Sequence, residues 1–321
     1  MERSVMIKHR VLTIFLLSFF CLMLLYPKTV FLGASEGLLL WFQTVLPTLL
    51  PYMILNNLMI HTSALQWICR VAAPVLCRIF ATSYYGSFAV LSGFLCGYPV
   101  GAKTTSDLLK KGQITYKEAA YLLSFCNNTS PVFVISYVVQ QNLQDPALTT
   151  PFLLILFLSP VLSSFLFRKC YSLPGNIITE SSLSFLESDS VQRKQADLFD
   201  ICIMNAFEAL TRIGGYMMFF TIAIRILSEF FPEHPFTLLL YATLELSTGI
   251  RMIAQSSYPA TYKIIFSASL TTFGGWCCVM QTHSMTSETH IPMLPYIAEK
   301  LVTAVVTSLL ISAYVYCFYT Y

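Results

Sequence analysis

Polar side chains interrupt an apolar stretch of the chain between residues 119 and 139. The interruption is the run Asn127, Asn128, Thr129 and Ser130. Ser130 stands before Pro131, and this pair is typical of a helix N-cap followed by proline at the first helical position. A helix N-terminus presents free N–H donors and about half a positive charge. We therefore expect these amides and hydroxyls to bind an anionic group.

Two further apolar stretches are broken by glycine or proline, and each carries polar side chains close by. The first break lies after Phe88 and comprises Gly97, Tyr98, Pro99 and Gly101, with Lys103 directly behind it. The second comprises Gly274 and Gly275, with Gln281, His283 and Ser284 behind it. We assign these residues, except His283, to the same candidate binding site. His283 fits a solvated membrane surface better, although histidine can also relay protons.

Broken helices have a specific meaning inside a membrane. Unwound backbone in lipid leaves N–H and C=O groups unpaired at a cost of several kcal/mol each. It persists only where protein, water or a solute supplies partners, and matched breaks in two halves of a transporter point to its binding site. The alternative is that glycine and proline only permit kinks and close packing.

Charged residues within apolar segments are the remaining candidates for chemistry, because they usually face a cavity or a partner. Glu245 has no basic residue within one helical turn. We predict that it is a protonatable coupling carboxylate or a cation ligand. Glu208 and Arg212 have the spacing of a structural ion pair. Arg225 and Arg251 can extend along the helix to a membrane surface.

The composition places these residues in a membrane protein. Of 321 residues, 56% are hydrophobic and only 11% are charged, against about 25% in soluble domains. The basic residues are scattered, which argues against nucleic-acid binding. No Walker, zinc-protease or nucleophile-elbow motif occurs, and no Cys-x-x-Cys pair suggests a metal site. We expect no enzyme, no metal and no cofactor.

The apolar runs predict an all-α, polytopic membrane helix bundle of about seven to nine membrane segments. A spanning helix needs about 20 apolar residues. Complete spans are expected at 11–32, 38–60, 148–168, 200–228 and 296–320, and the three broken stretches at 88–100, 119–139 and 264–280 predict half-helices or re-entrant segments. Thr115 and Glu118 have capping-box spacing, which predicts a helix start there.

The order of spans and breaks predicts two pseudo-repeated halves. We expect an N-terminal membrane helix at 1–34, uncleaved, a first half at 35–169, a polar cytoplasmic linker at 170–197 and a second half at 198–321. Lysine and arginine flank the linker and precede the first span, but are absent from 141–147 and 229–235. The positive-inside rule then places the N-terminus in the cytoplasm.

The motifs resemble a known family. The string Ser-Gly-x-x-x-Gly-Tyr-Pro-x-Gly-Ala-Lys at 92–103, the Leu-Ser-Phe-Cys-Asn-Asn string at 123–128 and Phe-Gly-Gly at 273–275 look like those of YlbJ-type sporulation integral membrane proteins. These belong to the wider nucleoside-recognition, or Gate, group, and the resemblance covers the chain from about residue 35 onward. It implies a protein of the inner membrane in spore-forming bacteria, acting from the mother cell at the outer forespore membrane.

The resemblance also implies a function. The YlbJ type is associated with moving dipicolinate, a planar aromatic dianion, toward the spore. Lys103 and the amides near Asn127 would suit its carboxylates, and Tyr98 or Phe125 its ring. We therefore expect a permease for a small anionic solute, with the lipid bilayer and other sporulation membrane proteins as partners. The alternatives are a membrane scaffold for spore assembly and a nucleoside or metal-ion carrier.

Overall fold

The structure is a computed structural model that describes residues 2–171, 195–231 and 234–319. All regular elements in these ranges are helical, which confirms the predicted all-α bundle. Six helical stretches are long and apolar enough to cross a membrane: Pro27–Ile60, Tyr116–Leu143, Pro146–Tyr171, Asp197–Phe230, Ala260–Thr289 and Met293–Tyr319. Leu16–Leu25 and Gly86–Cys96 are shorter apolar helices.

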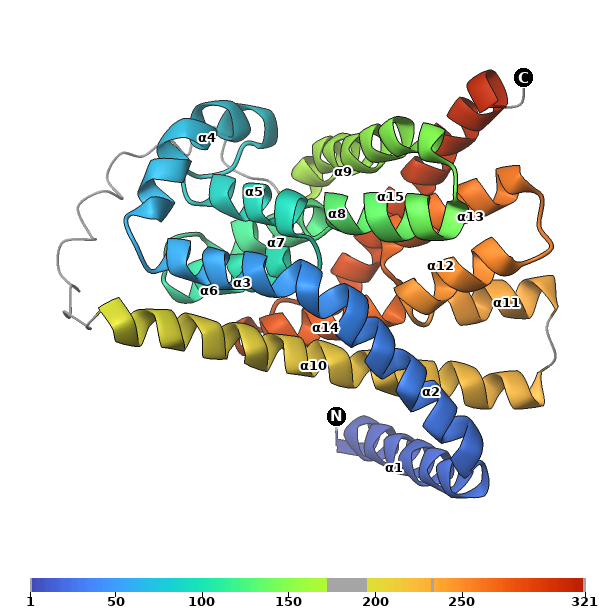
Figure 1. Cartoon of the computed structure of the whole chain (residues 1–321). Helices are drawn as coiled ribbons and strands as arrows, with labels where there is room; N and C mark the ends of the chain where they lie inside the picture. The colour runs from blue at the N-terminus through green and yellow to red at the C-terminus, as the bar shows by residue number, and fades with distance from the viewer. Residues whose placement is uncertain (1, 172–194, 232–233, 320–321) are drawn as a thin grey trace.

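The N-terminal helices form a bent arm beside the bundle (Figure 1). Helix α1 (Glu2–Leu25) ends before Tyr26, and α2 (Pro27–Leu40) begins with proline at its first position. The first helix therefore ends at Leu25, not near residue 32 as expected, because Pro27 lacks the N–H needed to continue it. The next rod runs from α2 through a π-helical turn (Trp41–Val45) into α3 (Leu46–Ile60).

Two pairs of short helices form the core of the first half. After α4 (Ala64–Phe80), α5 (Gly86–Cys96) and α6 (Val100–Lys110) are separated by residues 97–99. Helix α7 (Tyr116–Cys126) is separated by residues 127–130 from α8 (Pro131–Phe133), which continues as a π-helix (Val134–Leu143). Thr115 and Ser130 cap α7 and α8, as predicted. A 3-10 turn (Pro146–Leu148) leads into α9 (Thr149–Tyr171).

The second half has its short helices in a comparable order. The long α10 (Gln195–Phe230) is followed by α11 (Pro235–Ala242) and α12 (Leu246–Gln255), which are separated by residues 243–245. Helices α13 (Ala260–Phe273) and α14 (Gly275–Thr286) meet at Gly274. A 3-10 turn (Ser287–Thr289), α15 (Met293–Tyr314) and a π-helical turn (Val315–Tyr319) complete the chain. The predicted linker at 170–197 lies largely at 172–194, outside the described residues.

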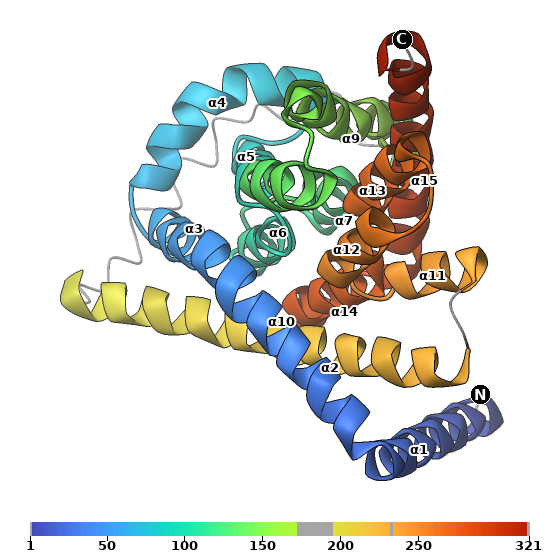
Figure 2. The same ribbon diagram turned by 45° about the vertical axis from the view of Figure 1, so that its right-hand side comes forward.

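The α2–α3 rod crosses α10 on one side of the bundle, and the two views agree on this (Figures 1 and 2). An ion-pair cluster joins these elements: Glu36 of α2 contacts Arg225 of α10 at 2.8 Å and also pairs with Arg251 of α12. The sequence analysis allowed both arginines to extend to a membrane surface. Both side chains are partly exposed, at 50% and 33%, and both also pair with Glu36.

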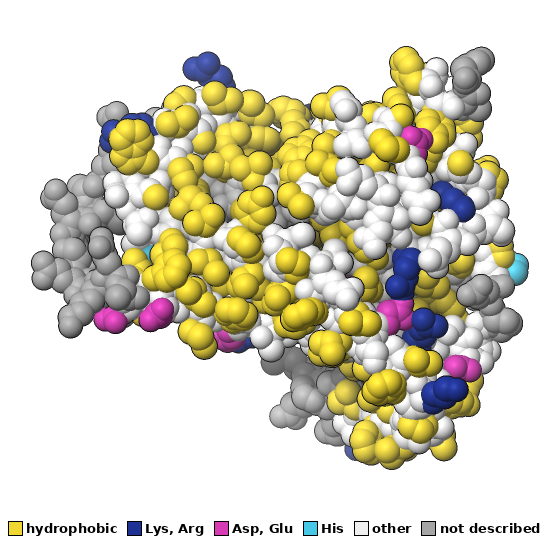
Figure 3. All heavy atoms as spheres, viewed as in Figure 1, with side chains coloured by type: hydrophobic (Ala, Val, Ile, Leu, Met, Phe, Trp, Pro, Cys, Tyr) yellow, Lys and Arg dark blue, Asp and Glu magenta, His cyan; other side chains and the backbone are white. Residues whose placement is uncertain are grey.

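Hydrophobic side chains cover most of the face seen in Figure 3, and charged ones are sparse. Trp67, Val71 and Val75 of α4, for example, are each more than half exposed. Such an apolar surface would be unfavourable in water at about 25 cal/mol per Å², whereas lipid covers it without cost. The chain is a multi-pass membrane protein.

Candidate functional site

The four helix interruptions meet at one place inside the bundle. Tyr98, from the break between α5 and α6, donates its hydroxyl to the carbonyl of Thr272 (2.9 Å), at the end of α13. Thr129, from the break between α7 and α8, donates to the carbonyl of Thr271 (2.7 Å). The N–H of Trp276 donates to the carbonyl of Thr243 (2.8 Å), in the break between α11 and α12. The unwound segments therefore satisfy one another's backbone groups.

The first break requires glycine for steric reasons. Gly97 has φ +86°, a region that side chains disfavour, and a Cβ there would stand 2.5 Å from the backbone N of Ser130. At Gly101 a Cβ would stand 2.6 Å from the carbonyl oxygen of Cys126. These two glycines let the α5–α6 break lie directly against the α7–α8 break. Pro99 follows Tyr98 through a cis peptide bond.

Asn127 is the most densely bonded side chain of the site. It is fully buried, and its Nδ2 donates to Thr282 Oγ1 (2.9 Å) and to the hydroxyl of Tyr296 (3.0 Å). Its Oδ1 accepts from the backbone N of Ala102 (3.3 Å). Asn128 donates to the carbonyl of Phe125 (2.6 Å), which closes the C-terminal end of α7.

The second half supplies a carboxylate and a glycine hinge. Glu245 is 2% exposed, and its two oxygens accept from the N–H groups of Ser247 (3.0 Å) and Thr248 (2.7 Å), so that it caps α12. Gly274 has φ +85°, and a Cβ there would stand 2.9 Å from Cζ of Tyr98. The glycine therefore provides room for the tyrosine ring that joins the two halves.

A buried lysine that the sequence analysis did not select lies at this junction. Lys300 of α15 is 1% exposed, and its ammonium donates to the carbonyl of Asn127 (3.0 Å) and to Oδ1 of Asn128 (3.2 Å). It also lies over the ring of Tyr98, 4.9 Å from the centroid. Within the described part of the chain, no carboxylate lies within ion-pairing distance of it.

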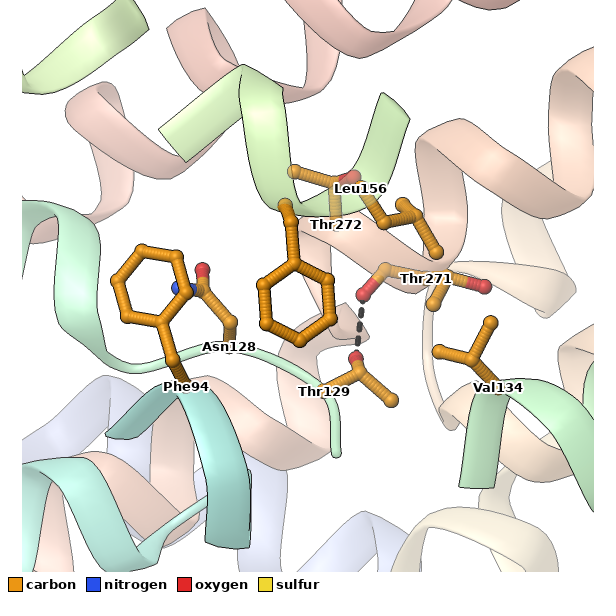
Figure 4. A pocket seen from close by; sticks show the side chains of 8 residues that line it. Phe94, Asn128, Thr129, Val134, Leu156, Thr271 and Thr272 are labelled. Atoms are coloured by element: carbon orange, nitrogen blue, oxygen red, sulfur yellow. Dashed lines mark hydrogen bonds between the residues drawn. The ribbon is translucent and has the colours of Figure 1, made fainter. Parts of the chain in front are cut away.

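A cavity of about 60 Å³ adjoins the junction, and 10–15 Å³ on this scale holds one water molecule. The polar side chains in its wall are Thr48, Tyr98, Thr129, Ser130, Glu245, Ser247 and Gln281. A smaller cavity of about 10 Å³ lies on the other side of Asn128 and Thr129. Figure 4 shows it between these residues, the ring of Phe94 and the end of α13.

The predicted site residues divide into a gathered set and two outliers. The gathered set surrounds the junction or its cavities: Gly97, Tyr98, Pro99, Gly101, Asn127, Asn128, Thr129, Ser130, Glu245, Gly274, Gly275 and Gln281. Lys103 instead forms an ion pair with Asp107 (2.8 Å), one helical turn further along α6. Ser284 is partly exposed. Neither lines the two cavities described above.

The sequence did contain a signal for Lys300. It is a lone cation within the apolar span predicted at 296–320, and charges inside such spans usually mark functional positions. The contribution of Tyr296 and Thr282 had no sequence signal, because tyrosine and threonine are common packing residues in membrane helices.

Comparison with known proteins agrees with the motifs. Residues 42–141 match the family described as nucleoside recognition, or Gate. The chain is 24% identical over 311 residues to the sporulation integral membrane protein YlbJ of Bacillus subtilis strain 168, covering 87% of this chain and 76% of that protein. No solved structure matches. The chain is thus similar over most of its length to the YlbJ-type sporulation membrane proteins and carries a Gate region, as its motifs predicted.

Proposed function

We propose that the chain is a permease for a small anionic solute and that the junction of the four interrupted helices binds this solute. The observation that carries the proposal is Lys300, a buried ammonium held by two amide oxygens and an aromatic ring without a carboxylate partner among the described residues. Burying an uncompensated charge costs several kcal/mol. A site that keeps such a charge is suited to receive the opposite charge from a ligand.

The geometry favours an anion with a flat apolar part. The ammonium of Lys300 offers a donor for a carboxylate, and charge-assisted hydrogen bonds are roughly twice as strong as neutral ones. The rings of Tyr98 and Phe94 supply aromatic surface on either side of the 127–130 break. Dipicolinate, which the family resemblance suggests, has this chemistry, and we propose it as the first solute to test, carried across the outer forespore membrane.

The cavity beside the junction is too small for a whole dipicolinate molecule. At about 60 Å³ it has room for roughly four or five water molecules. A carrier must close its site to alternate between the two membrane sides, and a compact cavity walled by residues of three helix breaks and of α14 fits a closed state. Residues at the breaks are the natural hinges, because hinges usually lie at element ends.

Uptake into proteoliposomes tests the proposal. The purified chain should accumulate radiolabelled dipicolinate, and Asn127→Ala should reduce the initial rate at least tenfold. The matched control is Asn142→Ala, whose side chain only donates to the carbonyl of Tyr137 (2.8 Å) at the end of the π-helix. Equal loss in both variants, or no uptake by the unmodified chain, would refute the assignment.

The same assay separates the other candidates. The matching family is described as nucleoside recognition, so uridine uptake without dipicolinate uptake would assign a nucleoside carrier. Uptake of ferrous iron alone would assign a metal-ion carrier. Absence of all three fluxes, together with a sporulation defect in a deletion strain, would assign a scaffold that assembles with other sporulation membrane proteins.

A further inference from the structure

A third cavity lies between α7, α9 and α15, and it is the largest of the three described here, at about 150 Å³. Tyr116, Tyr171 and Tyr296 form its aromatic walls, together with Pro292 and Pro295. None of the sequence predictions selected it. The hydroxyl of Tyr171 donates to Glu299 (2.5 Å) in its wall, so that this carboxylate is already paired.

This cavity shares a wall with the candidate binding site. Tyr296 lines the cavity and is itself only 2% exposed. Its hydroxyl accepts from Asn127 Nδ2 (3.0 Å) and lies 3.3 Å from Thr282 Oγ1. Lys300 follows Tyr296 by one turn of the same helix, so both side chains point from the same face of α15. Tyr296 therefore connects the cavity to Asn127, to which Lys300 also donates.

Charge at this end of the bundle favours an anion. Lys117 lies at the exposed rim of the cavity. Arg168 and Lys169 lie in the last turn of α9, next to Tyr171 in the chain. Glu299 in the wall is already paired with Tyr171, and cations near a site raise the local concentration of an anion and its association rate.

Resting on the proposed function, we propose that this cavity is an access site for the anionic solute, which then moves past Tyr296 to Lys300. The tyrosine and proline walls bind the flat apolar part, and the surrounding cations attract the carboxylates. The hydrogen bonds of Tyr296 to Asn127 and Thr282 hold the passage closed, and rotation of the ring opens it. An acyl chain of a lipid is the competing occupant, since the cavity wall is mainly apolar.

Filling the cavity tests the inference without touching the central site. Ala120 lines the cavity from α7, and Ala120→Phe should lower dipicolinate uptake at least tenfold. The matched control is Ala298→Phe, which adds the same volume to an exposed position of α15 that does not line the cavity. If Ala120→Phe transported at the unmodified rate, the inference would be overturned while the proposed function stood.

A milder substitution covers the case in which Ala120→Phe does not fold. In Ala120→Cys, an anionic, membrane-impermeant thiosulfonate should modify the new thiol, and dipicolinate should slow this modification at least fivefold. Mass spectrometry of the α7 peptide identifies the site, because the chain has ten cysteines of its own. Modification unaffected by dipicolinate, or achieved only by a lipid-soluble maleimide, would overturn the inference, and this readout does not require transport.

Discussion

Replacing Lys300 by methionine separates a binding role from a structural one. Methionine has nearly the same length and flexibility as lysine but carries no charge. The substitution removes the donor to Asn127 and Asn128 and the cation over the ring of Tyr98. If Lys300 serves folding, the substitution lowers the stability of the protein. If Lys300 serves a ligand, the substitution lowers the affinity for that ligand and leaves stability nearly unchanged.

The effect on stability is a balance of two contributions. Each amide oxygen that loses its donor costs about 1–3 kcal/mol when it stays buried. Against this, the protein no longer buries an ammonium, which relieves several kcal/mol. Since the two contributions nearly cancel, we expect the thermal midpoint in detergent to change by no more than about 4 °C, roughly the effect of 1 kcal/mol on a large domain.

The effect on solute binding has no such compensation. A hydrogen bond to a charged group contributes about 1.5–3 kcal/mol, which corresponds to a loss of affinity of roughly tenfold to more than hundredfold. Dipicolinate binding by calorimetry and uptake into proteoliposomes should both fall by this factor. If Lys300→Met lowered the thermal midpoint by tens of degrees, or bound dipicolinate normally, the reasoning from the unpaired ammonium would be refuted.

Two other substitutions test a lysine and a glycine, each against a second residue of the same type. Lys103→Ala breaks a partly exposed ion pair with Asp107 that contributes at most about 1 kcal/mol. Uptake should therefore fall less than fivefold. A loss as large as that of Lys300→Met would show that Lys103 belongs to the binding site. Gly93→Ala places a Cβ against the carbonyl of Cys126 and should destabilise the fold by about 1–3 kcal/mol. Gly215 has open space around it, so Gly215→Ala should leave stability unchanged. Denaturation in detergent measures both effects.

The sequence predicted the helix breaks well because their causes are local. Ser130 before Pro131 starts a new helix, and Gly274 can take the left-handed conformation that ends α13 because it has no Cβ. The class of fold followed from the low charge content and from the length of the apolar runs. The break at 243–245 is different, since this segment contains neither glycine nor proline. It forms because the carbonyls of Thr243 and Leu244 accept N–H groups from the start of α14, a tertiary contact that no local pattern encodes.

The partners of the site residues could not be read from the sequence. Asn127 and Tyr296 are separated by 169 positions, and so no spacing rule connects them. Lys103 was selected because it follows the Gly-Tyr-Pro motif, but the helix turns its side chain toward Asp107. Lys300 reaches the motif instead from a helix of the other half. Lys103 is close to the motif in sequence but points away from the junction, because α6 leads away from it.

Glu245 raises the question of how an anion could be drawn to a cavity whose wall holds a carboxylate. Its two oxygens already accept backbone N–H groups of α12, which favours the charged form, but burial outweighs these bonds and raises the pKa of the carboxyl. Repulsion between this carboxylate and a dianion would oppose binding unless a proton neutralised one of them. We therefore predict that each transport cycle carries a proton at Glu245, and that acid on the side of the solute stimulates uptake by the unmodified chain.

Glu245→Gln tests this coupling, because glutamine keeps an oxygen to cap α12 but cannot bind a proton. The variant should bind dipicolinate at least as well as the unmodified chain, since the repulsion is gone. It should also exchange labelled for unlabelled solute but no longer respond to a pH gradient. Uptake that still followed the gradient would show that the proton travels elsewhere, and loss of exchange together with the fold would show that Glu245 serves only to cap α12.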